Sequence, residues 1–201
     1  MSGAVVSLGD ASKKLDYIAE QLGEFKDQAP KVLKNAINDT ARKSKRLLAA
    51  EAKNKYTVKN AGFTKALQMK NATAKTLAAK IESRGEPLQL SRYKVSPASP
   101  KSDAKTTKAK VYSESSMKPL EKDRIKAFVT KFASGHVAVA QREGKERYPI
   151  KVLYSMAVPM MIGNEKKVMK KLRPEILKIL DEQTEVQIKK LLNRMKQKSE
   201  G

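Results

Sequence analysis

A stripe of small and aliphatic side chains between residues 30 and 52 constrains this chain more than any other feature. Its members recur at the three- and four-residue spacing of one helix face: Leu33, Ile37, Ala41, Ser44, Leu48 and Ala52. Pro30 suits the first turn of such a helix, because its missing N–H would have no partner there. The stripe predicts a long amphipathic helix that can approach another helix or a sheet closely.

A second helical pattern precedes this stripe, and a third closes the chain. The apolar residues of the first pattern are Leu15, Ile18, Leu22 and Phe25, with Asp10 or Ser12 placed to cap its start and Gln28 near its end. Those of the last pattern are Val168, Leu172, Ile176, Ile179 or Leu180, Val186 or Gln187, and Leu191. Pro174 is expected to kink this last helix or divide it in two.

The middle of the chain shows the shorter alternation that is typical of strands. IKAFVTKF, a turn at Ala133-Ser134-Gly135 and HVAVAQR together predict a β-hairpin, because glycine permits the positive φ of such turns. Leu77, Ala79 and Ile81 alternate as in a strand, and Tyr148-Pro149-Ile150 indicates an edge segment, since proline donates no ladder hydrogen bond. A stretch rich in Ser, Pro and Lys over about 96–108 is predicted to be a flexible insertion.

Together these patterns predict a single α+β domain over residues 1–201. We expect a small antiparallel β-sheet with a hairpin, packed with N-terminal helices and a long C-terminal helix. The expected bounds are about 10–55 for the N-terminal helices, 76–155 for the sheet region and 160–198 for the C-terminal helical region. Aromatic residues make up only 5% of the chain, so the core is lean, and packing on copies or partners is expected to complete it.

A strong excess of positive charge is the main compositional fact. Lys and Arg number 43 against 21 Asp and Glu, a formal net charge of +22, which attracts polyanions. Two clusters are candidates for an electrostatic or DNA-facing role: Arg42, Lys43, Lys45 and Arg46, and Lys166, Lys167, Lys170 and Lys171. Without interleaved aromatic residues, contact with phosphates is expected to be independent of sequence. A solvated helix face remains the alternative for each side chain.

No arrangement of catalytic residues stands out. The chain has one histidine, His136 in the predicted turn, and no cysteine, and its carboxylates are scattered among lysines. No glycine-rich phosphate loop occurs. We therefore predict no enzyme, no metal site and no cofactor, with a carboxylate-based nuclease as the one conceivable enzymatic alternative. No apolar run approaches the roughly 20 residues that span a bilayer, so no membrane partner is expected.

Several short pieces follow one another in a distinctive order between Ala127 and Pro159. They are Ala127-Phe128-Val129, Gly135-His136-Val137, Gln141-Arg142, Gly144-Lys145, Arg147-Tyr148-Pro149-Ile150-Lys151-Val152 and Met156-Ala157-Val158-Pro159. This order resembles the phage minor tail protein Z family, in which an AF-hairpin precedes a QR…GK.RYPI.V…MAVP signature and a C-terminal helix. KNAINDTARKSKR and AKIESRG agree in kind, whereas SPASPKSDAKTTK is this chain's own version of a variable region.

The resemblance implies a structural virion protein that completes the head-proximal end of the tail and supports head–tail joining, with a place near the DNA end left open. It implies a homo-oligomer in a six-fold ring, in contact with the tail terminator, the tail tube and head-completion or connector proteins, and with the packaged DNA as an open further partner. The implied location is the tail-neck region of the virion, after assembly in the host cytoplasm. A sequence-nonspecific basic DNA-binding protein is the alternative.

The residues that match the family pattern are expected to serve structure or interfaces. They are Phe128, Gly135, Gln141, Arg142, Arg147, Tyr148, Pro149, Met156 and Pro159. Tyr148-Pro149 and Pro159 are expected to fix the chain path between hairpin and C-terminal helix. Arg142 and Arg147 are expected to bridge to a carboxylate of the same or an adjacent subunit, because a planar guanidinium suits bidentate pairing.

Overall fold

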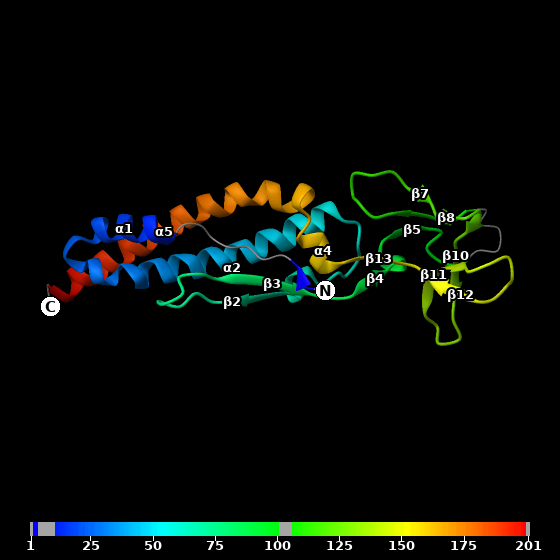
Figure 1. The fold of residues 1–201 in the computed structure, drawn as a ribbon, viewed down its shortest axis with the longest axis horizontal. Coiled ribbons are helices and arrows are strands. Elements are labelled where there is room, and N and C mark those ends of the chain that lie inside the picture. Colours follow the sequence, from blue (N-terminus) through cyan, green and yellow to red (C-terminus); the bar gives the residue numbers. More distant parts are fainter. Residues whose placement is uncertain (1, 4–10, 101–105, 200–201) are drawn as a thin grey trace.

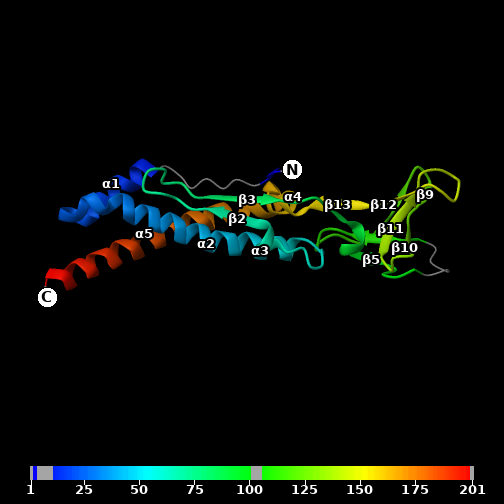
Figure 2. The same ribbon diagram turned by 90° about the horizontal axis from the view of Figure 1, so that it is seen from below.

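The computed structural model describes residues 2–3, 11–100 and 106–199. The protein is elongated, with a helical body at one end and a β-rich end at the other (Figure 1). Helices α2 (Ala29–Lys55) and α5 (Lys170–Ser199) run in opposite directions along the helical body and pack against each other. Figure 2 shows that α5 crosses α2 and that its C-terminal end diverges from it. The fold is α+β, as the sequence predicts.

Helix α2 confirms the stripe that dominates the sequence. All six of its members are buried: Leu33, Ile37, Ala41, Ser44, Leu48 and Ala52. Helix α5 packs against α2 and buries the larger residues Leu172, Ile176, Leu180, Ile188 and Leu191. Because each fully buried aliphatic side chain contributes roughly 1.5–3 kcal/mol, this contact is a major source of stability in a chain poor in aromatic residues.

The predicted first helix is shorter than expected. Helix α1 (Ala11–Leu22) ends before Gly23, which has φ +54°, and the chain continues as the 3₁₀ segment η1 (Gly23–Gln28). The prediction of a continuous helix to Gln28 is therefore wrong. Glycine adopts this left-handed conformation at little cost, and the conformation interrupts the regular α-helical hydrogen bonds. As a consequence, Phe25 leaves the apolar face and is 36% exposed.

The irregular part of the C-terminal region also differs from the expectation. Helix α4 (Val158–Ile162) is followed by a π-helical turn, η3 (Glu165–Met169), and α5 then runs unbroken with Pro174 inside it. A division at Pro174 is therefore wrong. The proline is the fifth residue of α5, so it removes only one hydrogen bond of the opening turn. The irregular hydrogen-bonding pattern lies before α5, in the π-helical turn η3.

Five small antiparallel sheets occur within the described ranges, where one sheet was expected. Their strands are, sheet by sheet, β1 (Ser2–Gly3), β3 (Lys80–Arg84) and β2 (Leu67–Lys70); β10 (Phe128–Lys131), β11 (Val137–Arg142) and β12 (Ile150–Val152); β13 (Tyr154–Ala157) and β4 (Pro87–Gln89); β5 (Lys94–Ser96), β6 (Lys108–Lys110) and β7 (Lys118–Pro119); β8 (Glu121–Lys122) and β9 (Ile125–Lys126). Two short helical elements, α3 (Phe63–Ala66) and η2 (Leu90–Arg92), complete the order.

The predicted hairpin is confirmed as β10 and β11. Phe128 pairs with Ala140 and Lys131 with Val137, and Gly135 in the turn has φ +82°. Strand β12 pairs with β11 alone, so it is the edge that the proline predicted. The expected strand around Leu77 begins later, at Lys80, because Leu77 has φ +42° and directly follows the turn at 74–76.

The β2–β3 hairpin lies along α2 in the helical body (Figure 1). The amide of Asn38 on α2 is buried and holds the hairpin loop, since its Oδ1 accepts from the backbone N–H of Ala72 at 2.7 Å and its Nδ2 donates to the oxygen of Ala72 at 3.1 Å. This pair of bonds fixes the register of the hairpin on the helix.

The expected flexible insertion over 96–108 has ordered margins. Ser96 in β5 pairs with Lys108 in β6, and Thr107 is buried. Residues 101–105 lie outside the described residues, so the mobility of the insertion stays a prediction. In the part of the chain that the structure describes, no helix is long and apolar enough to cross a membrane.

Candidate interaction surfaces

The first predicted basic cluster borders an open groove on α2. Arg42 and Arg46 are one helical turn apart, and both are exposed; Arg42 pairs with Asp39. Lys43 is exposed as well, and Lys45 is half-buried. Arg46 contributes to a groove of about 540 Å³ between the end of α2, the following loop and α3.

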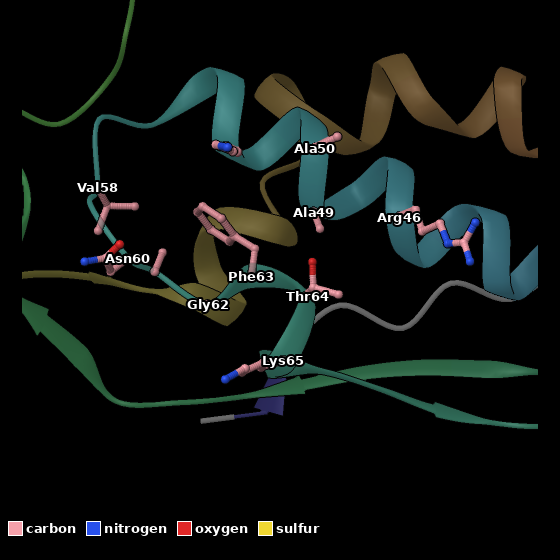
Figure 3. Close-up of a pocket in the computed structure, with 11 residues that line it drawn as sticks. Arg46, Ala49, Ala50, Val58, Asn60, Gly62, Phe63, Thr64 and Lys65 are labelled. Atoms are coloured by element: carbon pink, nitrogen blue, oxygen red, sulfur yellow. The ribbon is translucent and has the colours of Figure 1, made fainter.

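This groove has an apolar floor and a cationic margin. Ala49 and Phe63 project into the space between α2 and α3, beside Val58 and the Asn60–Gly62 loop (Figure 3). Three cations line it: Arg46, Lys53 and Lys65. Within the described residues none of these three forms an ion pair, so their charges face solvent. We call this surface, lined by Arg46, Ala49, Lys53, Phe63 and Lys65, the basic groove.

The second predicted cluster is partly taken up by internal ion pairs. Lys171 Nζ lies 2.9 Å from Glu51 Oε2, and the Glu51 side chain is only 8% exposed. Lys167 pairs with Glu114 and lies over the ring of Tyr112, 5.0 Å from its centroid. Lys166 and Lys170 are exposed. Two of the four cations therefore tie α5 and η3 to other elements, although Lys171 is itself exposed, and the other two form no ion pair among the described residues.

The structure does not join the two clusters into one patch. Glu51, the partner of Lys171, follows Arg46 by five residues on α2, so at about 100° per residue the two side chains lie on different helix faces. Arg46 faces the groove toward α3, whereas Glu51 faces η3 and α5. This separation was not predicted, because in the sequence both clusters are simply runs of basic residues.

The family-pattern residues of the hairpin serve its attachment. Gln141 on β11 is buried, and its Nε2 donates to the backbone oxygen of Ile125 at 2.6 Å. This bond connects the β10–β11–β12 sheet to the β8–β9 hairpin. Phe128 is half-buried opposite Ala140. These contacts give Gln141 and Phe128 a structural role in the β-rich end.

The next four residues of the pattern lie together on the surface. Arg142, Arg147, Tyr148 and Pro149 are all exposed, and Tyr148 is 66% exposed. The guanidinium of Arg147 lies over the Tyr148 ring at 5.7 Å from its centroid. Neither arginine pairs with a carboxylate among the described residues, so a bridge within the subunit is not observed and the bridge to an adjacent subunit stays a proposal.

The last two residues of the pattern hold the entry into α4. Pro159 is buried against the β3–β4 turn, where a Cβ placed on Gly85 would be only 3.4 Å from its Cδ. Met156 is half-buried, and its sulfur accepts from the hydroxyl of Tyr112 at 3.7 Å. Proline at the second position of α4 fits its role at a helix start.

Three tyrosines connect the helical body to the β-rich end, and sequence analysis did not single them out. Tyr56, at the C-cap of α2, lies 5.3 Å from Tyr112 between ring centroids. Tyr93 follows η2 and donates from its hydroxyl to the backbone oxygen of Met156 at 2.8 Å. We call Tyr56, Tyr93 and Tyr112 the tyrosine junction. The chain has only six tyrosines, and the position of Tyr56 directly after the long helical stripe was the one sequence feature that could have pointed to the junction.

Burial at the junction changes the acidity of two phenols. Loss of solvent raises the pKa of Tyr56 to about 12, with the neighbouring Tyr112 adding to the effect. Burial likewise raises the pKa of Tyr93 to about 12. Both hydroxyls are therefore neutral at physiological pH. The Tyr93 hydroxyl donates a hydrogen bond, whereas the Tyr56 hydroxyl is buried without a hydrogen-bond partner among the described residues.

The side chains that could ligate a metal, histidine and carboxylates, stay apart in the described part of the chain. Within residues 2–3, 11–100 and 106–199, no group of three or more His, Asp or Glu side chains is placed to hold a metal ion. His136 is exposed, and its Nε2 lies 2.6 Å from Gln89 Oε1, so it links the hairpin turn to β4. The features that stand out are the basic groove and the exposed Arg142–Pro149 edge.

Comparison with known proteins places the chain in a family. No curated protein and no solved structure matches it. The family model of the prophage minor tail protein Z (GPZ) matches residues 13–194, which include α2, α5, the tyrosine junction and the confirmed hairpin. Because this match extends over nearly the whole chain, the protein belongs to the prophage minor tail protein Z family.

Proposed function

We propose that this protein completes the head-proximal end of a phage tail and supports the joining of head and tail. Its family membership supports a structural role in a phage tail, and the head-proximal end is its proposed place of action there. The location that follows is the tail-neck region of the virion, reached after assembly in the host cytoplasm.

The proposed assembly is a ring of six copies, because tail tubes are generally six-fold. An elongated subunit supports this role, since its helical body and β-rich end offer two well-separated contact regions (Figure 1). In a ring, one region faces the tail terminator and tail tube, and the other faces the head-completion or connector proteins. The lean core is completed by contacts between copies.

The observation that carries a role near DNA is a set of exposed cations on the β-rich end. We call it the cationic β surface, and it comprises Lys94, Lys108, Lys118, Lys122, Arg124, Lys126, Lys131, Arg142, Lys145, Arg147 and Lys151. None of them forms an ion pair with another described residue. Such a surface suits the phosphates of a DNA end in the channel of a ring, bound without regard to sequence.

The first test removes the gene from the phage and supplies it again from a plasmid. Without the protein we expect DNA-filled heads and separate tails in electron micrographs of the lysate, and with it joined infectious particles. Labelled protein is expected at the head-proximal end of tails. Normal numbers of joined, infectious particles in the absence of the gene would refute the proposed role.

A second test separates the DNA contact from folding. Replacing Arg124, Lys126 and Lys145 by Gln is expected to lower infectivity while joined particles still form, because these side chains are exposed and their loss leaves the core intact. The matched control replaces Lys13, Lys26 and Lys178 on the helical body by Gln. Equal effects of the two triple variants would remove the special role of the cationic β surface.

A sequence-nonspecific basic DNA-binding protein is the second candidate, favoured by the net charge of +22. It predicts that the isolated chain binds duplex DNA strongly, with affinity that falls steeply with salt. The decisive observation is the particle: a tail component is present in purified virions in fixed copy number, whereas a free DNA-binding protein is absent from them.

A further inference from the structure

The end of α1 and the segment η1 form an acidic surface on an otherwise basic protein. Glu20, Glu24 and Asp27 are all exposed, and Phe25 stands among them with 36% of its side chain exposed. We call these four residues the acidic tip. Only one cation, Lys26, lies within this segment.

The carboxylates of the acidic tip have no ion-pair partner among the described residues. Other exposed carboxylates, such as Glu121 and Glu143, are also unpaired, but those of the acidic tip flank an exposed phenylalanine, Phe25. The basic groove shows the opposite imbalance, since Arg46, Lys53 and Lys65 surround an apolar floor without a carboxylate. The two surfaces thus complement each other in charge and in apolar character.

The two surfaces cannot meet within one molecule. Segment η1 leads directly into α2 at Ala29, and Arg46 begins the groove 17 residues later, roughly 25 Å along the helix axis. The acidic tip lies toward one end of the helical body, and the groove lies where the body meets the β-rich end (Figures 1 and 2). A partner for either surface must therefore come from another molecule.

We propose that the basic groove binds the acidic tip of a second copy of this chain. Phe25 of one copy enters between Ala49 and Phe63 of the next, while Glu24 and Asp27 approach Arg46 and Lys65. A contact between two different surfaces of identical chains is head-to-tail, and such contacts close into a ring when the rotation between copies allows it. This contact deepens the proposed ring and rests on the proposal that copies assemble in the tail.

Charge exchange tests the contact directly. Variant one carries Glu24→Lys and Asp27→Lys, and variant two carries Arg46→Glu and Lys65→Glu. Each variant alone places like charges in the contact, so its self-association, measured by sedimentation velocity, is expected to weaken on the order of tenfold or more. An equimolar mixture restores opposite charges in every contact, because the altered tip meets the altered groove, and is expected to associate like the unaltered chain.

Two controls match the change in net charge away from the contact. Glu175→Lys with Glu182→Lys adds the same charge as variant one, and Lys178→Glu with Lys189→Glu adds the same charge as variant two; all four positions are exposed and lie on α5. Both controls are expected to associate normally, and circular dichroism verifies that every variant is folded. Variants that associate normally alone, or a mixture that stays monomeric, would overturn the proposed contact.

Introduced cysteines give an independent measurement, because the chain has none of its own. Phe25→Cys in one preparation and Thr64→Cys in another are expected to form a mixed disulfide dimer under mild oxidation. Thr64 lies in the groove, whereas Ser134 in the hairpin turn is exposed and remote from it, so Ser134→Cys with Phe25→Cys is the control. Equal cross-linking of both pairs would count against the contact.

Failure of this contact and failure of the proposed function give different results. If the unaltered chain stays monomeric at every concentration tested but its gene is still needed for joined particles, the contact is wrong and the tail role stands. If the charge exchange works as described but particles join normally without the gene, the contact stands and the tail role is wrong.

Discussion

The hydroxyl of Tyr93 donates to the backbone oxygen of Met156 at 2.8 Å, across 63 residues of sequence. Tyr93 is 1% exposed and directly precedes β5 in the sequence. Met156 belongs to β13, which directly precedes α4. This bond joins the two connections between the helical body and the β-rich end, so the junction has little freedom to open.

Tyr93→Phe removes this bond and keeps the buried ring. We expect the free energy of unfolding to fall by about 1 kcal/mol, because the partly buried Met156 carbonyl loses its donor. Urea denaturation followed by circular dichroism measures the change. Tyr148→Phe, at an exposed position, is the control and is expected to leave stability unaltered. Equal stability of Tyr93→Phe and the unaltered chain would show that the bond does not hold the junction.

The junction also predicts a response to alkaline pH. Burial raises the pKa of Tyr56 and Tyr93 to about 12, against an ordinary value of 10.0 in the unfolded chain. Between these values the unfolded chain releases protons that the folded chain retains, so the free energy of unfolding must fall as pH rises from about 10 to 12. Urea midpoints across this range measure the effect. The double variant Tyr56→Phe with Tyr93→Phe is expected to show a shallower decline.

Gln141 is expected to matter for the stability of the β-rich end. In Gln141→Met the Ile125 carbonyl loses the donor that now lies 2.6 Å away, at a cost of about 1–2 kcal/mol in unfolding free energy. The neighbouring exposed Arg142→Met serves as the control and is expected to change stability by less than about 0.5 kcal/mol. A larger loss in Arg142→Met than in Gln141→Met would contradict the assigned role.

Two glycines near the hairpin are expected to respond differently to alanine. Gly135 has φ +82°, a region that a Cβ disfavours, so Gly135→Ala is expected to cost about 1–2 kcal/mol. Gly144 lies in open space without a positive φ, so Gly144→Ala is expected to be neutral or slightly stabilising. Thermal unfolding of both variants measures the difference, and equal melting temperatures would argue against the turn geometry.

Two adjacent lysines at the start of α5, Lys170 and Lys171, are expected to differ in their contribution to stability. Lys171→Met leaves the buried Glu51 without its cation, so unfolding free energy is expected to fall by about 1 kcal/mol or more. Lys170→Met, on an exposed lysine outside any ion pair among the described residues, is expected to have little effect. Chemical denaturation of both variants decides the matter. A loss of DNA binding in both, with stability intact, would restore the phosphate-facing interpretation of Lys171.

Prediction from sequence was most accurate where structure depends on near neighbours. The apolar spacing from Leu33 to Ala52 predicted α2, and the glycine turn between two alternating segments predicted the β10–β11 hairpin. It was less accurate at single residues that can break a helix, whose effect depends on their surroundings. Gly23 ended the first helix early despite Phe25 continuing the apolar spacing, and Pro174 did not divide α5.

The amino-acid sequence by itself determined the long helices α2 and α5, the hairpin, the excess of positive charge and the family, because periodicity, turn chemistry and motif order are local properties of the chain. Only the tertiary structure decided which cations are free. Lys171 meets Glu51 across 120 residues, while Arg46 is left at the margin of a groove with Phe63. Spacing along a chain cannot reveal such pairings, since they depend on which distant surfaces the folded core brings together.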